Sequence, residues 1–430
     1  MKEQLDIYLK KLFPITRSIT GEGNRETLRI LQEIIPLQIL EFPTGQKVFD
    51  WTVPKEWHIR DGWIKNSRGE KIVDFQKSNL HVVSYSKPIH FRGRLSEFRD
   101  KIHYLEHLPD AIPYRTSYYN EDWGFCISYN DFQKYFSENE EYELYIDSEL
   151  FDGSLSIGEL RISGKSEKEY LISSYICHPS MANDSLSGVL VTAFLAKYLL
   201  ENREKLEHSY RILFVPETIG AITYLANFQK EMEKIDNGLV ITTCGGTGKF
   251  GYKQSWEKDN FINQLIEDTF RESGIEDFLI YPFDVHGSDE RQYSSQGFRI
   301  NCATITKDKY YEYPYYHTSL DNLDFVLAEN LEKSLELYKK VVMKMDKNIV
   351  YRNRYPYGEV MLSKHDLYPK TGGAILPGSS VSALEIILNI LFYADGECDL
   401  FEISKKIGAD IELVYREAKT LEEKGILERV

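Results

Sequence analysis

Four residues that could bind a metal ion stand in polar loops just after apolar, β-branched stretches of the sequence. Such stretches are typical of buried strands. The residues are His178, Asp184, Glu217 and His317, and the stretches before them are 170–177, 210–215 and 299–305. Imidazole nitrogens and carboxylate oxygens suit Zn²⁺, with Mn²⁺ or Co²⁺ as substitutes. In one parallel sheet these side chains would share the carboxyl edge of the strands, where ligands collect, and they predict a metal site there.

Each of these four residues also has an ordinary structural explanation. Asp184 could cap the helix expected at 186–200, since aspartate is a common N-cap residue. Glu217 could cap the next helix, and His317 could stack among the tyrosines of 310–316. Any one of these explanations is plausible alone. Four such residues at one sheet edge favour the metal site.

Strands and helices alternate from about residue 155 onwards, which predicts an α/β domain. We expect one mostly parallel or mixed sheet with helices on both faces, a three-layer arrangement. The expected strands are 156–162, 170–177, 210–215, 239–244 and 299–305. The expected helices are 186–200, 221–234, 258–273 and 322–345, preceded by two amphipathic helices at 2–13 and 24–35.

The pattern differs between residues 49 and 145, where short alternating segments are separated by turn signals. Four of the five tryptophans of the chain fall here, at 51, 57, 63 and 123. We expect an inserted β-rich domain that forms a lid over the site. The alternative is a set of ordinary surface strands on the main domain. The α/β domain would then consist of residues 1–48 and 146–350.

Residues 351–430 are expected to form a linker and a winged-helix domain. Helical patterns at 382–394, 399–407 and 410–424 have the layout of a helix-turn-helix. From 381 to 430, six Lys or Arg stand against eleven Asp or Glu, a net charge of −5. A phosphate backbone would be repelled by this charge, so we expect no nucleic-acid binding. Protein contact or homo-oligomer formation is the expected use of this domain.

The composition is that of an ordinary globular chain. Of the 430 residues, 42% are hydrophobic and 28% are charged, and the formal net charge is −15. That charge argues against a general affinity for nucleic acid or for anionic membranes. We see no signal peptide or stretch of membrane-spanning length. The five cysteines are scattered, which indicates reduced, buried thiols and a cytoplasmic location.

Several motifs together resemble those of a known enzyme clan. Residues 182–188, Ala-Asn-Asp-Ser-Leu-Ser-Gly, resemble the metal-binding loop of zinc aminopeptidases related to bacterial leucyl aminopeptidase, aminopeptidase Y and glutaminyl cyclase. Residues 287–289 resemble their Gly-Ser-Asp-His loop, and 317–321 their last ligand motif. Residues 17–23 and 49–57 resemble an aminopeptidase-like bacterial subgroup that is often labelled as polysaccharide biosynthesis proteins. That subgroup carries an inserted β-rich domain and a C-terminal winged helix on a zinc-exopeptidase-like domain.

The resemblance implies roles for the candidate ligands. Asp184 would be the central carboxylate, Glu217 and His317 would complete one metal site, and His178 would belong to a second. Asp289 would orient the substrate or hold a hydrogen-bond chain. The candidate strand 239–244 ends without the carboxylate that a second ion needs, and its Cys244 lies in an apolar run. We therefore expect one tightly bound zinc, with His178 as a fourth ligand or as part of a weak second site.

The chain departs from the clan in its glutamates. The clan usually has two adjacent glutamates, one a ligand and one a general base, whereas here Glu217 stands alone between Pro216 and Thr218. The role of Glu217 as ligand or base therefore stays open. Glu290 replaces the usual histidine after Ser-Asp, and it could supply the missing base or bind a substrate ammonium group.

The sequence thus predicts a zinc-dependent hydrolase of the aminopeptidase type. An acidic pocket with Asp289 and Glu290 suits a substrate with a free amino group, a peptide or an aminoacyl amide. Three further residues of the same polar loop are expected to contact the substrate, namely His286, Arg291 and Tyr293. One alternative is a deacylase or cyclase that uses the same metal site. Another is a non-catalytic sensor or scaffold with a decayed peptidase domain.

Overall fold

The computed structural model describes residues 1–368 and 382–430, so the part of the expected linker at 369–381 lies outside the described residues. Two compact units are present. The first comprises Met1–Asn260 and Phe270–Tyr338, and the second comprises Phe261–Thr269 and Lys339–Val430. All five cysteines are free and buried, as expected. None of the helices in the described ranges has the length and apolar character of a membrane-crossing segment.

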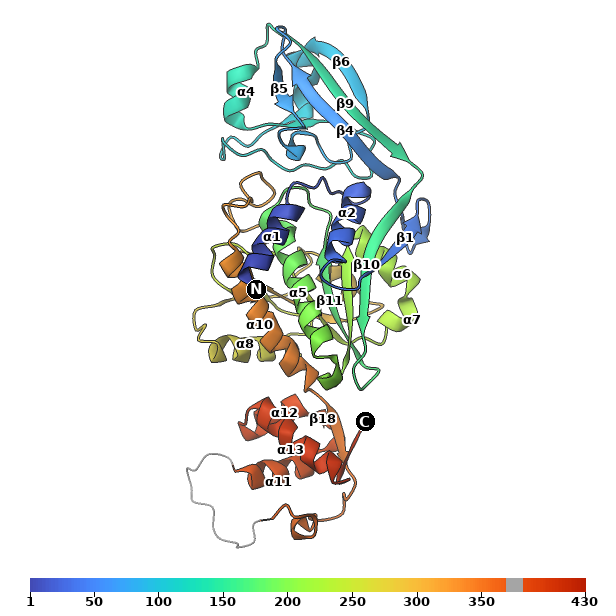
Figure 1. Ribbon diagram of the computed structural model, residues 1–430, viewed down its shortest axis with the longest axis vertical. Coiled ribbons are helices and arrows are strands. Elements are labelled where there is room, and N and C mark those ends of the chain that lie inside the picture. Colours follow the sequence, from blue (N-terminus) through green and yellow to red (C-terminus); the bar gives the residue numbers. More distant parts are fainter. Residues whose placement is uncertain (369–381) are drawn as a thin grey trace. The chain divides into compact units, whose positions relative to one another are not determined.

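An eight-stranded mixed sheet forms the centre of the first unit (Figure 1). Its strand order is β1-β10-β12-β11-β13-β16-β14-β15. The bounds are β1 Gln38–Pro43, β10 Ser154–Ile162, β11 Glu169–Tyr175, β12 Ser209–Val215, β13 Asn237–Val240, β14 Gly251–Lys253, β15 Leu279–Tyr281 and β16 Asn301–Thr306. The expected α/β class with a mixed sheet is confirmed, and the two short strands β14 and β15 were not expected.

Four central strands run parallel, and this arrangement builds the site. β11 pairs with β12 and β13, and β13 pairs with β16, all in parallel register. Their residues are almost all buried, which suits the continuous apolar runs that predicted them. Their carboxyl ends therefore lie at one edge of the sheet. β13 ends at Val240, earlier than the expected residue 244, and Thr243 beyond it has a φ of 45°.

Helices of the first unit pack on this sheet. α5, Gly188–Glu201, contacts β11 and β12, and it lies along β11 in Figure 1. α6, Ile219–Asn227, shares a buried apolar cluster with Leu171 and Leu213 of the sheet. In place of the single helix expected at 221–234, the structure has two helices, α6 and α7 Gln229–Met232. Further helices of the first unit are α1 Lys2–Leu12, α2 Glu22–Leu31 and α9 Glu290–Tyr293. Two helices, α8 Phe261–Glu272 and α10 Ala328–Asp346, have residues in both units.

The segment between β1 and β10 contains a four-stranded antiparallel sheet with the order β5-β4-β9-β6 (Figure 1). We call residues 56–151 the insertion. Its sheet strands are β4 Glu56–Lys65, β5 Lys71–Asp74, β6 Ile89–Arg94 and β9 Glu141–Phe151. An apolar cluster with Ile64, Phe98 and Leu144 fills its interior. Because β9 runs to Phe151, the β-rich segment extends past the expected end at 145.

Short elements complete this part of the chain. A small hairpin precedes the insertion, and two short helices and a further strand pair lie within it. They are β2 Lys47–Val48, β3 Trp51–Thr52, α3 Leu95–Phe98, β7 Ile102–His103, β8 Phe125–Cys126 and α4 Tyr129–Tyr135.

Three helices and a three-stranded sheet make up most of the second unit. They are β17 Val350–Asn353, α11 Ala383–Tyr393, β18 Asp395–Asp399, α12 Leu400–Ile407, α13 Ile411–Glu423 and β19 Leu427–Arg429. Ser382, Asp399 and Asp410 each cap a helix with a side-chain oxygen that accepts a backbone N–H bond. Gly408 ends α12 with a φ of 64°, a conformation that glycine adopts at little cost. The three expected helices are confirmed.

Candidate metal and catalytic site

Three of the predicted ligands meet at the carboxyl edge of the sheet. Nε2 of His178 and Nε2 of His317 lie 3.9 and 3.1 Å from Oδ2 of Asp184. One ligand atom of each residue lies within 4.8 Å of the other two. His178 and Asp184 are buried, whereas the His317 side chain is 34% exposed. Two imidazoles and one carboxylate form a ligand set that leaves zinc a position open to substrate.

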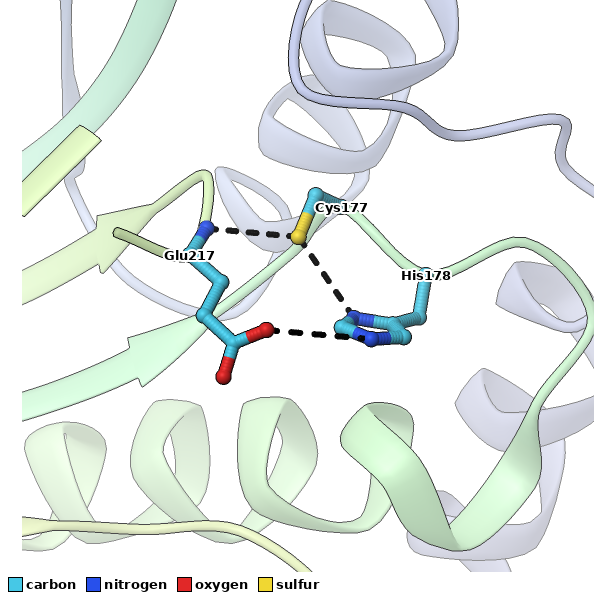
Figure 2. A group of neighbouring side chains, drawn as sticks. All are labelled: Cys177, His178 and Glu217. Carbon is cyan, nitrogen blue, oxygen red and sulfur yellow. Dashed lines mark hydrogen bonds and ion pairs between the residues drawn. The ribbon is translucent and has the colours of Figure 1, made fainter. Parts of the chain in front are cut away.

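The carboxylate of Glu217 faces the imidazole of His178 (Figure 2). Its Oε2 is 3.8 Å from Nε2 of His178, and its side chain is 28% exposed. The backbone N–H of Glu217 donates to Sγ of Cys177 over 3.2 Å, and that sulfur lies 3.4 Å from Nδ1 of His178. Cys177 therefore occupies the Nδ1 side of the ring, which leaves Nε2 for a metal.

Cys177, His178 and Glu217 form a second group of possible metal ligands, and their ligand atoms also lie within 4.8 Å of one another. Burial raises the pKa of the Cys177 thiol well above its ordinary value. Sγ of Cys177 accepts the backbone N–H of Glu217 and faces Nδ1 of His178, whereas the carboxylates of Asp184 and Glu217 face Nε2. We therefore favour the group formed by His178, Asp184 and His317.

The charge states at this edge suit a metal. Burial alone would raise the pKa of Asp184, but His178 and His317 beside it lower that pKa to about 2. Burial lowers the pKa of His178 to about 4, so its imidazole is neutral at pH 7. Metals bind ionised carboxylates and neutral imidazoles. Burial and the charge of Asp184 raise the pKa of Glu217 to about 7, a value suited to proton transfer near neutral pH.

The backbone of His317 and the position of its Nε2 support this interpretation. His317 has a φ of 54°, a left-handed conformation that is strained for a residue with a side chain. Its Nε2 is buried and lies 3.1 Å from Oδ2 of Asp184, where it makes no well-aligned hydrogen bond. Strain and unsatisfied buried polar atoms gather at functional sites, because the function compensates for their cost. The residues present fit a zinc ion.

Asp321 holds the loop that carries Asp184, a role that the sequence did not reveal. Its carboxylate accepts the backbone N–H groups of Asn183 and Asp184 over 2.6 and 2.9 Å, and the hydroxyl of Tyr313 over 2.8 Å. Burial raises its pKa to about 7. Its place four residues after His317, within the motif 317–321, is the one signal that could have indicated it.

We expect Asp321→Ala to destabilise the protein strongly. The variant leaves two buried N–H groups without an acceptor, and each costs about 1–3 kcal/mol. Urea unfolding should therefore show a free energy of unfolding lower by about 2–6 kcal/mol. The matched control is the exposed Asp324→Ala, which should change that free energy by less than about 0.5 kcal/mol. Equal stability of the two variants would contradict the role of Asp321.

Tyr175, at the end of β11, also fixes Asp184. Its hydroxyl donates a short hydrogen bond to Oδ1 of Asp184. The hydroxyl of Thr242 donates to Tyr175 over 2.7 Å. This chain leaves Oδ2 of Asp184 facing the two histidines. Nothing in the sequence pattern distinguishes Tyr175 from the other apolar residues of its strand.

Arg17 links the N-terminal motif to the site. Its Nε donates to the carbonyl of His178 over 2.8 Å, and its Nη1 donates to the carbonyl of Leu12 over 2.7 Å. Arg17 is 1% exposed, and burial lowers its pKa to about 10. The motif at 17–23 therefore supports the loop that carries His178.

Asp289 and Glu290 lie at the start of α9, and both are fully buried. Oδ1 of Asp289 accepts the backbone N–H of Thr218 over 2.7 Å and thereby fixes the turn after Glu217. Oε1 of Glu290 accepts from Nζ of Lys253 over 2.9 Å and from the Tyr310 hydroxyl over 2.6 Å. This buried ion pair gives no support to Glu290 as a general base or as a partner for a substrate ammonium group.

The three residues expected to contact substrate lie in different environments. His286 and Arg291 are exposed, and Arg291 donates to the carbonyl of Val285 over 3.2 Å. Tyr293 is 0% exposed, and its hydroxyl lies 2.8 Å from that of Ser173 in the sheet. This position gives no support to Tyr293 as a substrate contact, because the side chain lies in the apolar core.

The end of β13 offers no ligand for a second ion. Cys244 is buried, burial raises its pKa to about 12, and its backbone N–H donates to the hydroxyl of Ser187. The hydroxyl of Thr243 pairs with that of Thr306 over 2.7 Å. Both groups of metal-ligating types found in the described part of the chain contain His178, and neither contains Cys244.

Comparison with known proteins places the chain. A family model described as a domain of unknown function (DUF4910) matches residues 7–348. The chain belongs to the DUF4910 family. A second model, for a winged helix-turn-helix, matches residues 349–429 and confirms the expected C-terminal domain of this DUF4910 protein.

Relatives of this DUF4910 protein agree with the predicted resemblance. A Clostridium acetobutylicum protein, provisionally named for polysaccharide biosynthesis with an aminopeptidase-like domain, is 41% identical over 413 residues, which cover 96% of this chain and 93% of the relative. A crystal structure of a provisionally named peptidase from the same organism shares 38% identity, with a TM-score of 0.85, over 100% of this chain and 96% of that one.

A zinc aminopeptidase from Bacillus subtilis shares the fold. It is 12% identical to the DUF4910 chain with a TM-score of 0.58, and the match covers 80% of this chain and 95% of that one. At this identity the likeness shows the fold alone, because one fold supports many functions.

Proposed function

We propose that this protein is a zinc-dependent hydrolase of the aminopeptidase type, which acts on peptides or aminoacyl amides. The observation that carries the proposal is the group of His178, Asp184 and His317 around one point, with Glu217 beside it. The aminopeptidase-like fold and the name of the Clostridium acetobutylicum relative support it.

The proposed roles divide between binding and proton transfer. His178, Asp184 and His317 would hold zinc, which when bound supplies a Lewis acid that polarises a carbonyl. Glu217 would take a proton from the attacking water and return it to the leaving amine. Its partial exposure leaves its carboxylate within reach of substrate, whereas Glu290 is buried in an ion pair. We therefore assign Glu217, and not Glu290, as the base.

We further propose that the insertion restricts substrates to small or terminal groups. Residues 112–114 lie against the loop of His317 through backbone hydrogen bonds, so they would form a fixed wall. This arrangement differs from a lid that opens freely. A folded protein cleaved internally as fast as a dipeptide amide would contradict this proposal.

Because Glu217 has no adjacent glutamate, two other functions stay open. One is a deacylase or cyclase that uses the same metal site, and the other is a non-catalytic scaffold. The test is metal analysis of the purified protein, followed by a screen of substrates with the zinc-loaded protein. The screen contains aminoacyl amides, N-acylated amino sugars and peptides with an N-terminal glutamine. Fastest turnover of aminoacyl amides supports the proposal. Preference for either other class favours a related reaction, and no turnover of any class favours the scaffold.

We expect the full chain to bind no duplex DNA at micromolar concentration, even in low salt. The cations of α13 are already paired, Arg416 with Glu417 at 3.0 Å and Lys419 with Glu422 at 2.6 Å. These pairs and the net charge of −5 over residues 381–430 oppose contact with a phosphate backbone. Fluorescence anisotropy with a random labelled duplex measures this. Micromolar or tighter binding would contradict it and would point to a nucleic-acid partner for the winged helix.

A further inference from the structure

The insertion is hydrogen-bonded to the loop that carries His317. The backbone N–H of Tyr114 donates to the carbonyl of His317 over 2.8 Å, and that of Ser319 donates to the carbonyl of Ile112 over 2.9 Å. Pro113 and Thr318 form an antiparallel bridge between the two segments. A carbonyl bond at the strained residue His317 helps to hold its left-handed backbone.

Tyr114 also brings its ring to both histidines. The ring centroid lies 5.4 Å from that of His178 and 5.2 Å from that of His317, and the His317 contact is edge-to-face at 83°. The side chain is 7% exposed, and its hydroxyl is 2.8 Å from that of Tyr118. A buried ring fixed at both ends restricts the rotation of both imidazoles.

Tyr316 also packs against His317. Its ring stacks on the imidazole with centroids 3.9 Å apart and an interplanar angle of 16°. The His317 ring is therefore in contact with both Tyr316 and Tyr114. His178 and Asp184 contact the same imidazole, and the two tyrosines add to the contacts that limit its orientation.

We propose that Tyr114 is a positioning residue of the metal site, supplied by the insertion, which holds His178 and His317 in the orientation that binds zinc. The inference rests on the proposed zinc site and deepens it. Groups that orient metal ligands typically contribute 10–100-fold to metal affinity. The insertion would then be a structural part of the metal centre.

The test compares zinc affinity among variants of the full chain, measured by competition with a chromophoric chelator. Tyr114→Ala should weaken zinc binding by about 10-fold or more. Tyr114→Phe should change it by no more than about twofold, because the ring that packs on both imidazoles remains. The visible absorption of Co²⁺-loaded protein should change in the alanine variant and not in the phenylalanine variant.

The control is Tyr104→Ala. Tyr104 stacks on Phe132 inside the insertion with centroids 4.4 Å apart, and its ring also contacts that of Tyr129. Its loss should loosen the insertion and leave zinc affinity unchanged. Should Tyr114→Ala not fold, Tyr114→Leu retains apolar volume without a ring and takes its place.

If the alanine or leucine variant of Tyr114 binds zinc as tightly as the wild type, the inference about Tyr114 is overturned and the proposed zinc site stands. An equal loss in Tyr104→Ala would also overturn it, because the effect would then be general to the insertion. A wild-type chain that binds no zinc would overturn the proposed function and this inference together.

Discussion

Glu217→Gln is expected to lower kcat by about 10²–10⁴-fold, the usual contribution of a general base, while zinc content stays at the wild-type level. Glutamine keeps the size of the side chain and removes its ability to take a proton. Zinc is retained because the three favoured ligands, His178, Asp184 and His317, remain in place. Steady-state kinetics on an aminoacyl amide and metal analysis of the same sample measure both effects.

The control for this substitution is Glu312→Gln, which changes an exposed glutamate that forms an ion pair with Lys309 at 2.7 Å. It should leave kcat unchanged. Loss of zinc from the Glu217 variant would assign Glu217 as a ligand. Unchanged kcat with zinc retained would show that Glu217 is not the general base.

His317→Ala is expected to remove zinc from the purified protein. The substitution deletes one of three proposed ligands, so the affinity should fall by more than about 100-fold, beyond the effect of a group that only orients a ligand. Chelator competition and metal analysis measure this. Alanine leaves the backbone free to keep the bond between Tyr114 and residue 317, so the fold should persist.

Cys244→Ser is the matched control for the histidine variant. Cys244 is buried and its thiol is neutral, so the serine variant should keep one zinc per chain. Two tightly bound ions in the wild type, with one lost in Cys244→Ser, would contradict the one-zinc assignment. Full zinc content in the His317 variant would contradict the ligand set.

The strand pattern and the motifs were enough to predict the fold class and the edge where the ligands meet. Apolar runs such as 170–177 specify buried parallel strands, and residues after such strands must share an edge. The pattern did not predict the true end of β13. The left-handed backbone at Thr243 depends on neighbours from β16, which no local signal reports.

The environments of the polar loop could not be predicted from its composition. Glu290 pairs with Lys253, which is 37 residues earlier in the chain, and only tertiary packing brings the two together. Tyr293 looked like a binding residue because its neighbours are polar, yet one helical turn directs it into the core. Tyr114 carries no motif at all, because its role depends on where the insertion meets the His317 loop.

The most direct test of the proposed function is a zinc titration of metal-free protein while the turnover of an aminoacyl p-nitroanilide is followed. The proposed site predicts activity that rises in proportion to added zinc and reaches a plateau at one equivalent per chain, since His178, Asp184 and His317 surround one point. A plateau at two equivalents would contradict the single-metal site. No turnover with zinc fully bound would contradict a hydrolase.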